Sequence, residues 1–303
     1  MTKHCNFLVK ACCMSFIIGA SSGSSILNAQ QLSLGGGLGL STYWGDLNSG
    51  NIGADLMHNS GLAGQLTAIY QPSSFYSLRM NVLFGRMMGS DALSEKQWQR
   101  ERNFSFQSRL TDVSLRVMVH PWSFGNKKGS FGVTPFASTG LALFNFDPTT
   151  EYQGMIYRLQ PLGTEGQGIA GFQKKYNLTQ FSVPFGGGLK LEVSEKIDVI
   201  LEAYAVKTFT DYLDDVGHKY VNYYTILNEN GLLAAQLSDR TPEALGLTEP
   251  MDRTTGSQKG GKFGDYYLLT SITVAYKLSS GGKVFSNLKG SGVVCPQKSR
   301  IRP

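Results

Sequence analysis

The sequence has no long apolar run and few charged residues. Past its N-terminal region, no stretch of about 18 consecutive apolar residues occurs, so no helix that could cross a membrane is predicted. Charged residues make up 17 % of the chain, and no signature of nucleic-acid binding is present, so no nucleic-acid partner is expected. Glycine, by contrast, accounts for 36 of 303 residues. This composition favours a β-rich structure with many turns over a helical enzyme.

Cysteine is also scarce, with four residues in the chain. Residues 1–29 are predicted to be a secretory signal peptide, with Lys3 and Lys10 before or beside the apolar stretch ACCMSFIIGA and a cleavage point after Ala29. Cleavage would remove three of the four cysteines and leave Cys295 alone. The mature fold is therefore expected to stand without an intramolecular disulfide. Removal of two lysines and no acidic residue would lower the net charge from +6 to +4.

What the chain does contain is period-two alternation, which is clearest in Asp265–Leu278 (DYYLLTSITVAYKL). Every second residue from Tyr266 to Leu278 is apolar apart from Thr270, whereas the intervening set is mixed and ends at Lys277. Such alternation predicts a strand with two different environments. Ten residues at about 3.3 Å each, tilted by about 40–45°, cover roughly 23–25 Å, close to the height of the apolar band of an outer-membrane barrel. The apolar face is therefore predicted to contact lipid.

The same alternation recurs in seven more segments. The eight predicted strands lie near residues 33–44, 62–70, 78–85, 112–119, 133–144, 180–192, 198–205 and 265–278. The fold class is accordingly all-β, an eight-stranded antiparallel transmembrane β-barrel in which the last strand pairs back with the first.

The connections between these strands alternate in length. Short connections rich in turn formers lie at residues 71–74, 121–130 and 194–196. Long connections, expected to be unstructured, lie at residues 45–60, 88–103, 147–176 and 208–264. This asymmetry is typical of an outer-membrane barrel with long extracellular loops, short periplasmic turns and both termini in the periplasm.

Three parts of the chain follow from these patterns. Residues 1–29 are the predicted signal peptide and residues 30–278 the outer-membrane barrel. Residues 279–303 are a flexible basic tail, placed in the periplasm, with too little apolar content to fold alone. The tail is expected to contact a periplasmic partner or peptidoglycan.

The polar faces of the predicted strands carry charges of both signs. They are Arg79, Asp112, Arg116, Lys190, Glu192, Glu202 and Lys277. A soluble barrel of lipocalin type would turn an apolar face inward to hold a ligand, and these groups would line such a cavity poorly. In a membrane barrel they would face the lumen and pair across it. Because eight strands enclose a space only just wide enough for side chains, we expect a filled lumen rather than a passive pore.

Candidate catalytic and metal-binding residues are few. A lipid-modifying barrel would need a histidine beside a nucleophile, but His58, His120 and His218 belong to no recognised motif, so no catalytic residue is expected. Asp211, Asp214 and Asp215 offer hard oxygen ligands for calcium, but their spacing is not that of an EF-hand. A solvated loop with turn-stabilising aspartates is the simpler interpretation. No metal site and no cofactor are expected.

Two further motifs have structural interpretations. The glycines of Gly35–Gly37 and Gly186–Gly188 lie within predicted strands, so close packing or tight curvature explains them better than a phosphate-binding loop does. The segment Lys96–Arg102 (KQWQRER) is interpreted as a solvated loop face, with contact to lipopolysaccharide phosphates as an alternative role.

Seven strings in a fixed order carry a resemblance to a known family. They are residues 41–47 (STYWGDL), 145–148 (NFDP), 160–168 (QPLGTEGQG), 183–188 (VPFGGG), 211–216 (DYLDDV), 234–240 (AAQLSDR) and 265–267 (DYY). In this order they resemble the PorG-like outer-membrane barrel family of Bacteroidetes, which is associated with the type IX secretion system. The resemblance covers about residues 32–278. It implies association with a periplasmic secretion ring that includes a lipoprotein, and it brings no catalytic residue.

The expected function is therefore that of a non-enzymatic barrel that anchors or scaffolds the type IX machinery in the outer membrane. Its expected partners are outer-membrane lipid, lipopolysaccharide and the ring proteins. A general structural barrel without a secretion role is the first alternative. A lipid-modifying barrel enzyme is the second.

Overall fold

The structure is a computed structural model that describes residues 31–122, 131–217, 219–251, 253–261 and 264–278. The predicted signal peptide and the basic tail with Cys295 lie outside the described residues. Among the helices in the described part of the chain, none is long and apolar enough to cross a membrane.

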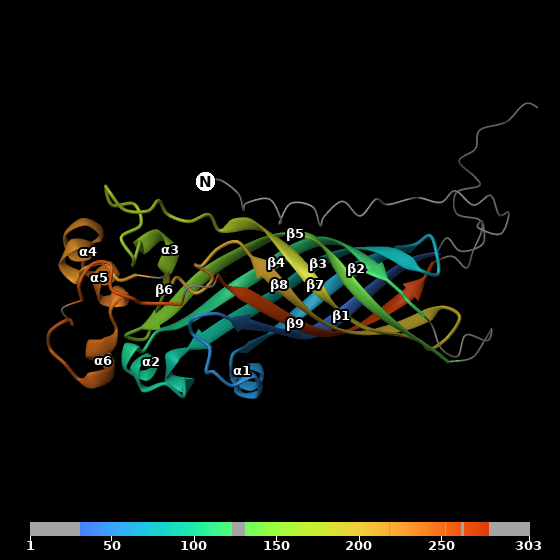
Figure 1. The fold of residues 1–303 in the computed structure, drawn as a ribbon, viewed down its shortest axis with the longest axis horizontal. Coiled ribbons are helices and arrows are strands. Elements are labelled where there is room, and N and C mark those ends of the chain that lie inside the picture. The colour runs from blue at the N-terminus through green and yellow to red at the C-terminus, as the bar shows by residue number, and fades with distance from the viewer. Residues whose placement is uncertain (1–30, 123–130, 218, 252, 262–263, 279–303) are drawn as a thin grey trace, which may run out of the picture.

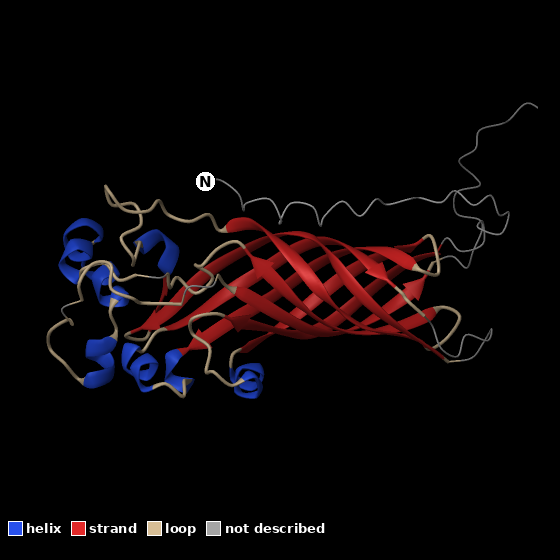
Figure 2. Ribbon diagram, in the orientation of Figure 1, coloured by secondary structure: helices blue, strands red, loops and turns tan. Residues whose placement is uncertain are grey.

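Eight long strands form a closed antiparallel barrel (Figures 1 and 2). They are β1 (Gln31–Trp44), β2 (Ser60–Gln71), β3 (Tyr76–Ser90), β4 (Ser105–Val119), β5 (Gly132–Tyr152), β7 (Thr179–Glu192), β8 (Ile197–Thr208) and β9 (Tyr266–Lys277). Each pairs with its neighbours along the chain, and the ring closes where β9 pairs with β1, from Ser33 opposite Lys277 to Trp44 opposite Tyr266. The predicted fold class and the predicted pairing of the last strand with the first are confirmed.

The outer surface of the barrel is apolar and its inner surface is not. Outward-facing side chains such as Leu38, Leu66 and Phe181 are 64–76 % exposed, while the residues between them are turned into the barrel. An apolar surface of this extent is not stable in water and fits a hydrocarbon environment. Because the seven charged residues predicted to line the lumen do face inward, the arrangement is opposite to that of a soluble ligand-binding barrel, and the membrane-barrel interpretation is confirmed.

Several strands are longer than predicted. The fifth predicted strand ends at Phe144, whereas β5 continues to Tyr152 and turns into the short strand β6 (Met155–Arg158). The reason is an inversion of the pattern: beyond Leu143 the outward-facing residues are polar, and the inward-facing Phe144 and Phe146 are fully buried. Here the strands rise above the apolar band, so their outer face meets water and their inner face builds an apolar core.

The prediction that the four long connections are unstructured is wrong. They contain α1 (Ile52–His58), the 3-10 helix η2 (Asp91–Leu93), α2 (Gln97–Arg102), α3 (Leu159–Leu162), α4 (Tyr223–Asn230), α5 (Leu232–Ser238) and α6 (Thr241–Leu245). Each has eight residues or fewer, too short to show a clear helical period in the sequence. Asn51, Ser90 and Asn222 cap three of them by accepting hydrogen bonds from backbone N–H groups.

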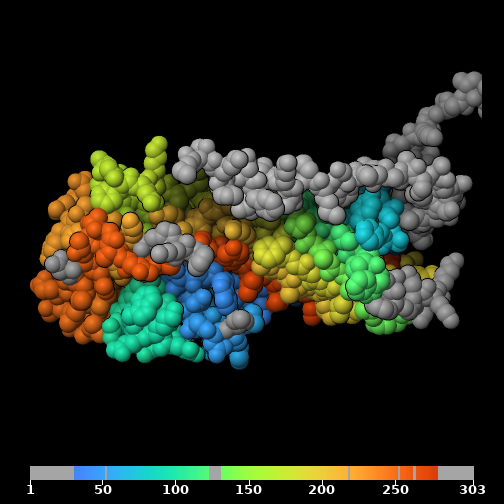
Figure 3. Space-filling model, in the orientation of Figure 1, coloured from blue at the N-terminus to red at the C-terminus, as the bar shows by residue number. Residues whose placement is uncertain are grey.

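These connections fold together into a single layer over one end of the barrel, which we call the cap: the described residues of 45–59, 91–104, 153–178 and 209–265. In the space-filling view its blue, teal and orange segments lie against one another at the end opposite the short turns (Figure 3). One apolar cluster runs from the upper barrel into the cap and includes Phe106, Phe146 and Leu213. The long loops are thus one packed unit with the upper barrel, rather than separate excursions.

Candidate functional site: a filled lumen under a folded cap

Charged side chains from opposite walls meet in the middle of the lumen. Glu202 of β8 forms ion pairs with Arg79 of β3 at 2.9 Å and with Arg116 of β4 at 3.2 Å. β8 and β3 are four strands apart in the ring of eight, so the Arg79–Glu202 pair spans the lumen. Gln65 of β2 donates from Nε2 to Glu202 at 3.2 Å, and all four side chains are buried. The expected pairing across the lumen is confirmed.

The remaining interior charges are also partnered. The contacts are Lys277 with Asp198 at 2.8 Å, Lys190 with Glu192 at 3.6 Å, and Asp112 with the donating hydroxyl of Tyr267 at 2.8 Å. All seven charged residues that were predicted to face the lumen take part in these contacts or in the Glu202 cluster. The described side chains therefore fill the lumen along much of its length.

The structure does not bring the candidate histidines together. His58 is the exposed last residue of α1 in the cap, His120 lies at the opposite end of the barrel, and His218 lies outside the described residues. His120 is 2.9 Å from the Ser77 hydroxyl, but both side chains are buried. Burial and the nearby charge of Lys190 lower the pKa of His120 to about 4. The pair is thus shielded from lipid, and its imidazole is neutral near pH 7.

Three of the seven strings meet at the hydroxyl of Tyr43, where β1 enters the cap. This hydroxyl is 2.7 Å from a carboxylate oxygen of Asp214 and 3.0 Å from one of Asp265, and it accepts from the Asp46 N–H at 2.7 Å. A phenol carries one proton, so it can donate to only one of the two carboxylates. The other contact needs a proton on the second aspartate. The geometry therefore describes two carboxyl groups that share one proton.

The electrostatics of this pair agree with the hydrogen-bond count. Burial, followed by the charges of Asp265 and Asp46, raises the pKa of Asp214 well above its usual value. The pKa of Asp265 is likewise raised well above its usual value, first by burial and then by nearby acidic groups such as Asp211. The other oxygen of each carboxyl accepts a backbone hydrogen bond. The Leu213 N–H donates to Asp265, and the Val216 N–H donates to Asp214.

The other aspartate of the acidic string is also used within the cap. Asp215 accepts from the hydroxyl of Tyr176 at 2.7 Å and from the hydroxyl of Thr164. Burial, with the charge of Glu165, raises the pKa of Asp215 to about 6. Within the described residues, no three His, Cys, Asp or Glu side chains are grouped as a metal site would require. The expectation of a solvated acidic loop is wrong, because Asp214 and Asp215 are buried and bonded to cap residues.

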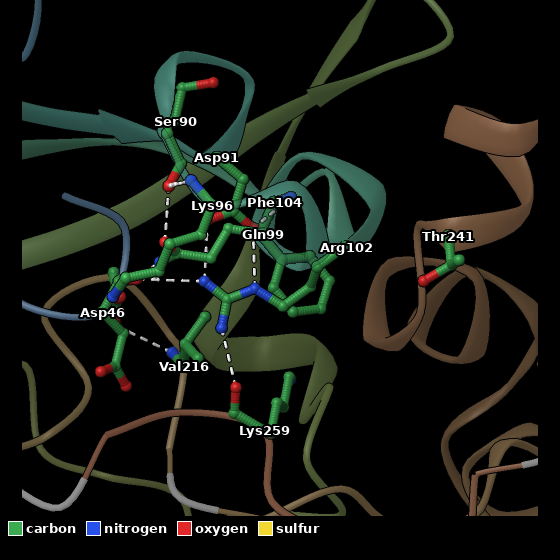
Figure 4. A network of polar contacts seen from close by, with 12 residues as sticks. Asp46, Ser90, Asp91, Lys96, Gln99, Arg102, Phe104, Val216, Thr241 and Lys259 are labelled. Atoms are coloured by element: carbon green, nitrogen blue, oxygen red, sulfur yellow. Dashed lines mark hydrogen bonds and ion pairs between the residues drawn. The ribbon is translucent and has the colours of Figure 1, made fainter. Parts of the chain in front are cut away.

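Arg102 connects three separate segments of the cap (Figure 4). Its guanidinium forms a two-point contact with Asp91 at 2.7 and 2.8 Å and donates to the backbone carbonyls of Lys259 at 2.8 Å and Asp46 at 3.1 Å. Asp91 also accepts from the Phe104 N–H at 3.0 Å. The interpretation of Lys96–Arg102 as a solvated face is wrong for Arg102, which is 2 % exposed.

The glycine strings lie within strands, as predicted. A Cβ on Gly186 or Gly188 would collide with backbone atoms of the neighbouring strand β8. Close approach of β7 and β8 therefore explains Gly186 and Gly188, and close approach of β1 and β9 explains Gly35 and Gly37 in the same way.

The cap also carries an open cleft of about 1080 Å³ above the ends of β7 and β8. One wall contains the stacked rings of Tyr176 and Tyr212, 4.9 Å apart, and Tyr176 in turn stacks at 5.9 Å on the buried Phe146 behind it. The Tyr212 hydroxyl donates to Gln173 at 2.7 Å. Aromatic rings beside amide and charged groups, such as Glu165 and Lys219, are typical of a binding surface. The string 211–216 contributed to this wall, but its role was not evident before the fold placed it beside Tyr176.

A family model described as a domain of unknown function, DUF6089, matches residues 12–232. The chain belongs to this family. A search of curated proteins found no match.

Solved outer-membrane barrels are similar in fold at low identity. Neisserial surface protein A (NspA) is 10 % identical over 82 % of this chain and 97 % of its own, with a TM-score of 0.38. The outer membrane protein OprG from Pseudomonas aeruginosa is 9 % identical over 82 % and 96 %, with a TM-score of 0.35. The attachment invasion locus protein Ail of Yersinia pestis, in complex with the heparin analogue sucrose octasulfate, is 10 % identical over 82 % and 99 %, with a TM-score of 0.34.

Proposed function

We propose that this DUF6089 protein is a non-enzymatic outer-membrane barrel that anchors or scaffolds the type IX secretion machinery. The observation that supports a scaffold most directly is the Glu202 cluster: a lumen crossed by buried ion pairs is not available for solute passage. In this proposal the protein acts through contacts that its outer surfaces make with partner proteins. The type IX assignment itself rests on the resemblance of the seven strings to the PorG-like family.

The cap is proposed to face the cell exterior, with the short turns and both termini in the periplasm. The asymmetry of long and short connections supports this orientation. On the short-turn rim, Phe75 and Trp122 are 56 % and 59 % exposed, and the described part of the chain ends at this rim with Leu278. The proposed partner at this rim is a periplasmic ring that includes a lipoprotein.

Two experiments test the proposal. Deletion of the gene should abolish export of type IX cargo, and expression of the full chain should restore it; normal cargo export in the deletion strain would show that the barrel has no secretion role. Affinity purification of the full chain should recover the ring proteins, and a chain lacking residues 279–303 should recover less. Equal recovery of the ring proteins by both chains would show that the contact is made by the short turns and not by residues 279–303.

The lipid-modifying alternative has its own test. His58→Ala and His120→Ala chains should leave the lipid A profile of the cells unchanged. A changed profile in either strain would favour an enzymatic function over a scaffold.

A further inference from the structure

Two arginines stand side by side on the outer surface of the barrel. Arg86 of β3 and Arg109 of β4 are directly opposite each other in the strand pairing, and both face outward and are exposed. Among the described residues, neither guanidinium has a hydrogen bond or an ion pair. Like charges at directly opposed positions repel each other and weaken the strand pair. An anion between the two guanidinium groups would remove this repulsion.

The height of the pair matches the boundary of the membrane. Tyr76 is opposite Val119 near the short-turn rim, and Arg86 and Arg109 lie ten residues further along their strands. Ten residues at about 3.3 Å, tilted by about 40–45°, rise roughly 23–25 Å, the height of the apolar band. The outward-facing residues between are apolar apart from one threonine on β4: Leu78, Met80, Val82 and Phe84 on β3, and Val117, Leu115, Val113 and Thr111 on β4. The arginines therefore lie at the level of lipid headgroups.

The surroundings of the pair leave it positively charged. Asp147 of β5 is opposite Arg109 in the strand pairing, but its carboxylate is bound by Arg158 at 2.9 Å. Arg86, Arg109 and Arg158 thus contribute three guanidinium groups beside the single carboxylate of Asp147. Arginine binds phosphate through two parallel hydrogen bonds, which makes a pair of unpartnered guanidinium groups a suitable site for a phosphate ester.

A groove begins directly above the arginines. The next outward-facing residues on the three strands are Met88, Gln107 and Thr149, which are paired with one another in the sheet. They line a groove of about 250 Å³ together with His58 of α1, Ile156 of β6 and Glu151 of β5, whose carboxylate lies at the end of the groove away from the arginines. The amide of Gln107 can donate to and accept from sugar hydroxyls, and the hydroxyl of Thr149, which donates to the Gln107 carbonyl at 2.9 Å, can accept from one. A sugar attached to the phosphate would therefore find a polar recess on the side away from the membrane.

We propose that Arg86 and Arg109 bind the phosphate group of a phosphorylated glycolipid in the outer leaflet, with the adjoining sugar in the groove above them. This inference rests on the proposed orientation of the cap toward the cell exterior, but not on the secretion role. The two proposals can therefore fail separately. Loss of lipid binding in a variant that still supports cargo export would support the lipid site without bearing on the secretion role.

The test is binding of bis-phosphorylated lipid A to the full chain in detergent micelles, followed by native mass spectrometry. Arg86→Gln/Arg109→Gln should reduce retention by about tenfold or more, because two charge-assisted contacts are lost. Arg86→Lys/Arg109→Lys should recover part of it, since charge is kept without the paired donors. The matched control is Lys207→Gln, which removes one exposed charge from the upper end of β8, on a distant part of the ring, and should bind as the parent does.

Two further arms identify the source of the phosphate. Lipid A without its phosphates should bind as poorly to the parent chain as intact lipid A binds to the double glutamine variant. Inorganic phosphate should not displace intact lipid A. Equal retention by the double glutamine variant and the parent would overturn the proposal, as would equal binding of dephosphorylated lipid A. Displacement by inorganic phosphate would overturn the lipid source. Heat-modified gel mobility confirms that each variant is a folded barrel.

Discussion

The lumen and the cap are both held by buried charges, but the two regions place these charges by different means. In the lumen, Glu202 meets its arginines because strand alternation turns all three side chains inward at heights set by the β-ladder. In the cap, Arg102 and Asp91 come from a short helix and a 3-10 turn, and no ladder positions them. In the lumen, the hydrogen-bonded backbone of the strands sets where the charged side chains lie. In the cap, the contacts of the charged side chains hold the backbone segments in place. Breaking one contact in the lumen should therefore destabilise the whole barrel, whereas breaking one in the cap should destabilise the cap alone.

The largest effect is expected from Glu202→Gln. The change leaves two buried arginines without their carboxylate, and removal of one partner from a buried pair costs about 3–5 kcal/mol of unfolding free energy. The whole barrel should lose this stability, because the ladder couples its strands. Urea unfolding in detergent, followed by gel mobility, measures the loss. Glu192→Gln, at a 3.6 Å pair near the rim, is the control. An equal loss in both variants would contradict the central role of Glu202.

The cap counterpart is Arg102→Met, with an expected loss of about 3 kcal/mol that is confined to the cap. The change keeps much of the side-chain volume but removes the contacts to Asp91 and to two backbone carbonyls. Hydrogen exchange should accelerate in residues 91–104 and 253–261 while the β-strands remain protected. Arg100→Met on the same helix, at an exposed position, should change little. Faster exchange throughout the strands would show that the two regions are not separable.

The same contrast explains what could be predicted from the sequence. Alternation in Asp265–Leu278 predicted the strand, its lipid face and its partner, because a period of two follows directly from backbone geometry. The same alternation also predicted that the charged residues on the polar faces of the strands point into the lumen. The cap could not be derived this way, since Asp214 and Asp265 lie 171 and 222 residues from Tyr43, in irregular segments that have no period to detect. The resemblance strings contained all three residues, and Asp214 also belonged to the acidic set considered for calcium, but neither observation indicated that the three residues touch.

A pH titration should separate the regions further. Asp215 has a folded-state pKa of about 6, above its unfolded value, so the folded cap binds the proton more tightly. Its contribution to stability is then present at low pH and is lost as pH rises through about 6, by on the order of 2 kcal/mol. Hydrogen exchange in the cap should be slower near pH 5 than near pH 8, after correction for the intrinsic rate. Asp215→Asn should reduce this dependence, and what remains is the contribution of other cap carboxyls with raised pKa values, such as Asp214. A cap that is more stable at the higher pH would contradict the assignment.

The smallest effect is expected from Arg158→Gln. Its ion pair with Asp147 has an N–O distance of 2.9 Å, the same as that between Arg79 and Glu202 in the lumen. The side chains at the surface are 56 % and 30 % exposed, however, whereas those in the lumen are 0 % and 1 % exposed. Water solvates both surface charges when they separate, so the loss in unfolding free energy should be within about 0.5 kcal/mol. Urea unfolding of Arg158→Gln beside Glu202→Gln compares two pairs of equal length. If both variants lost several kcal/mol, distance rather than burial would determine the strength of these contacts, and the distinction between exposed and buried pairs would fail.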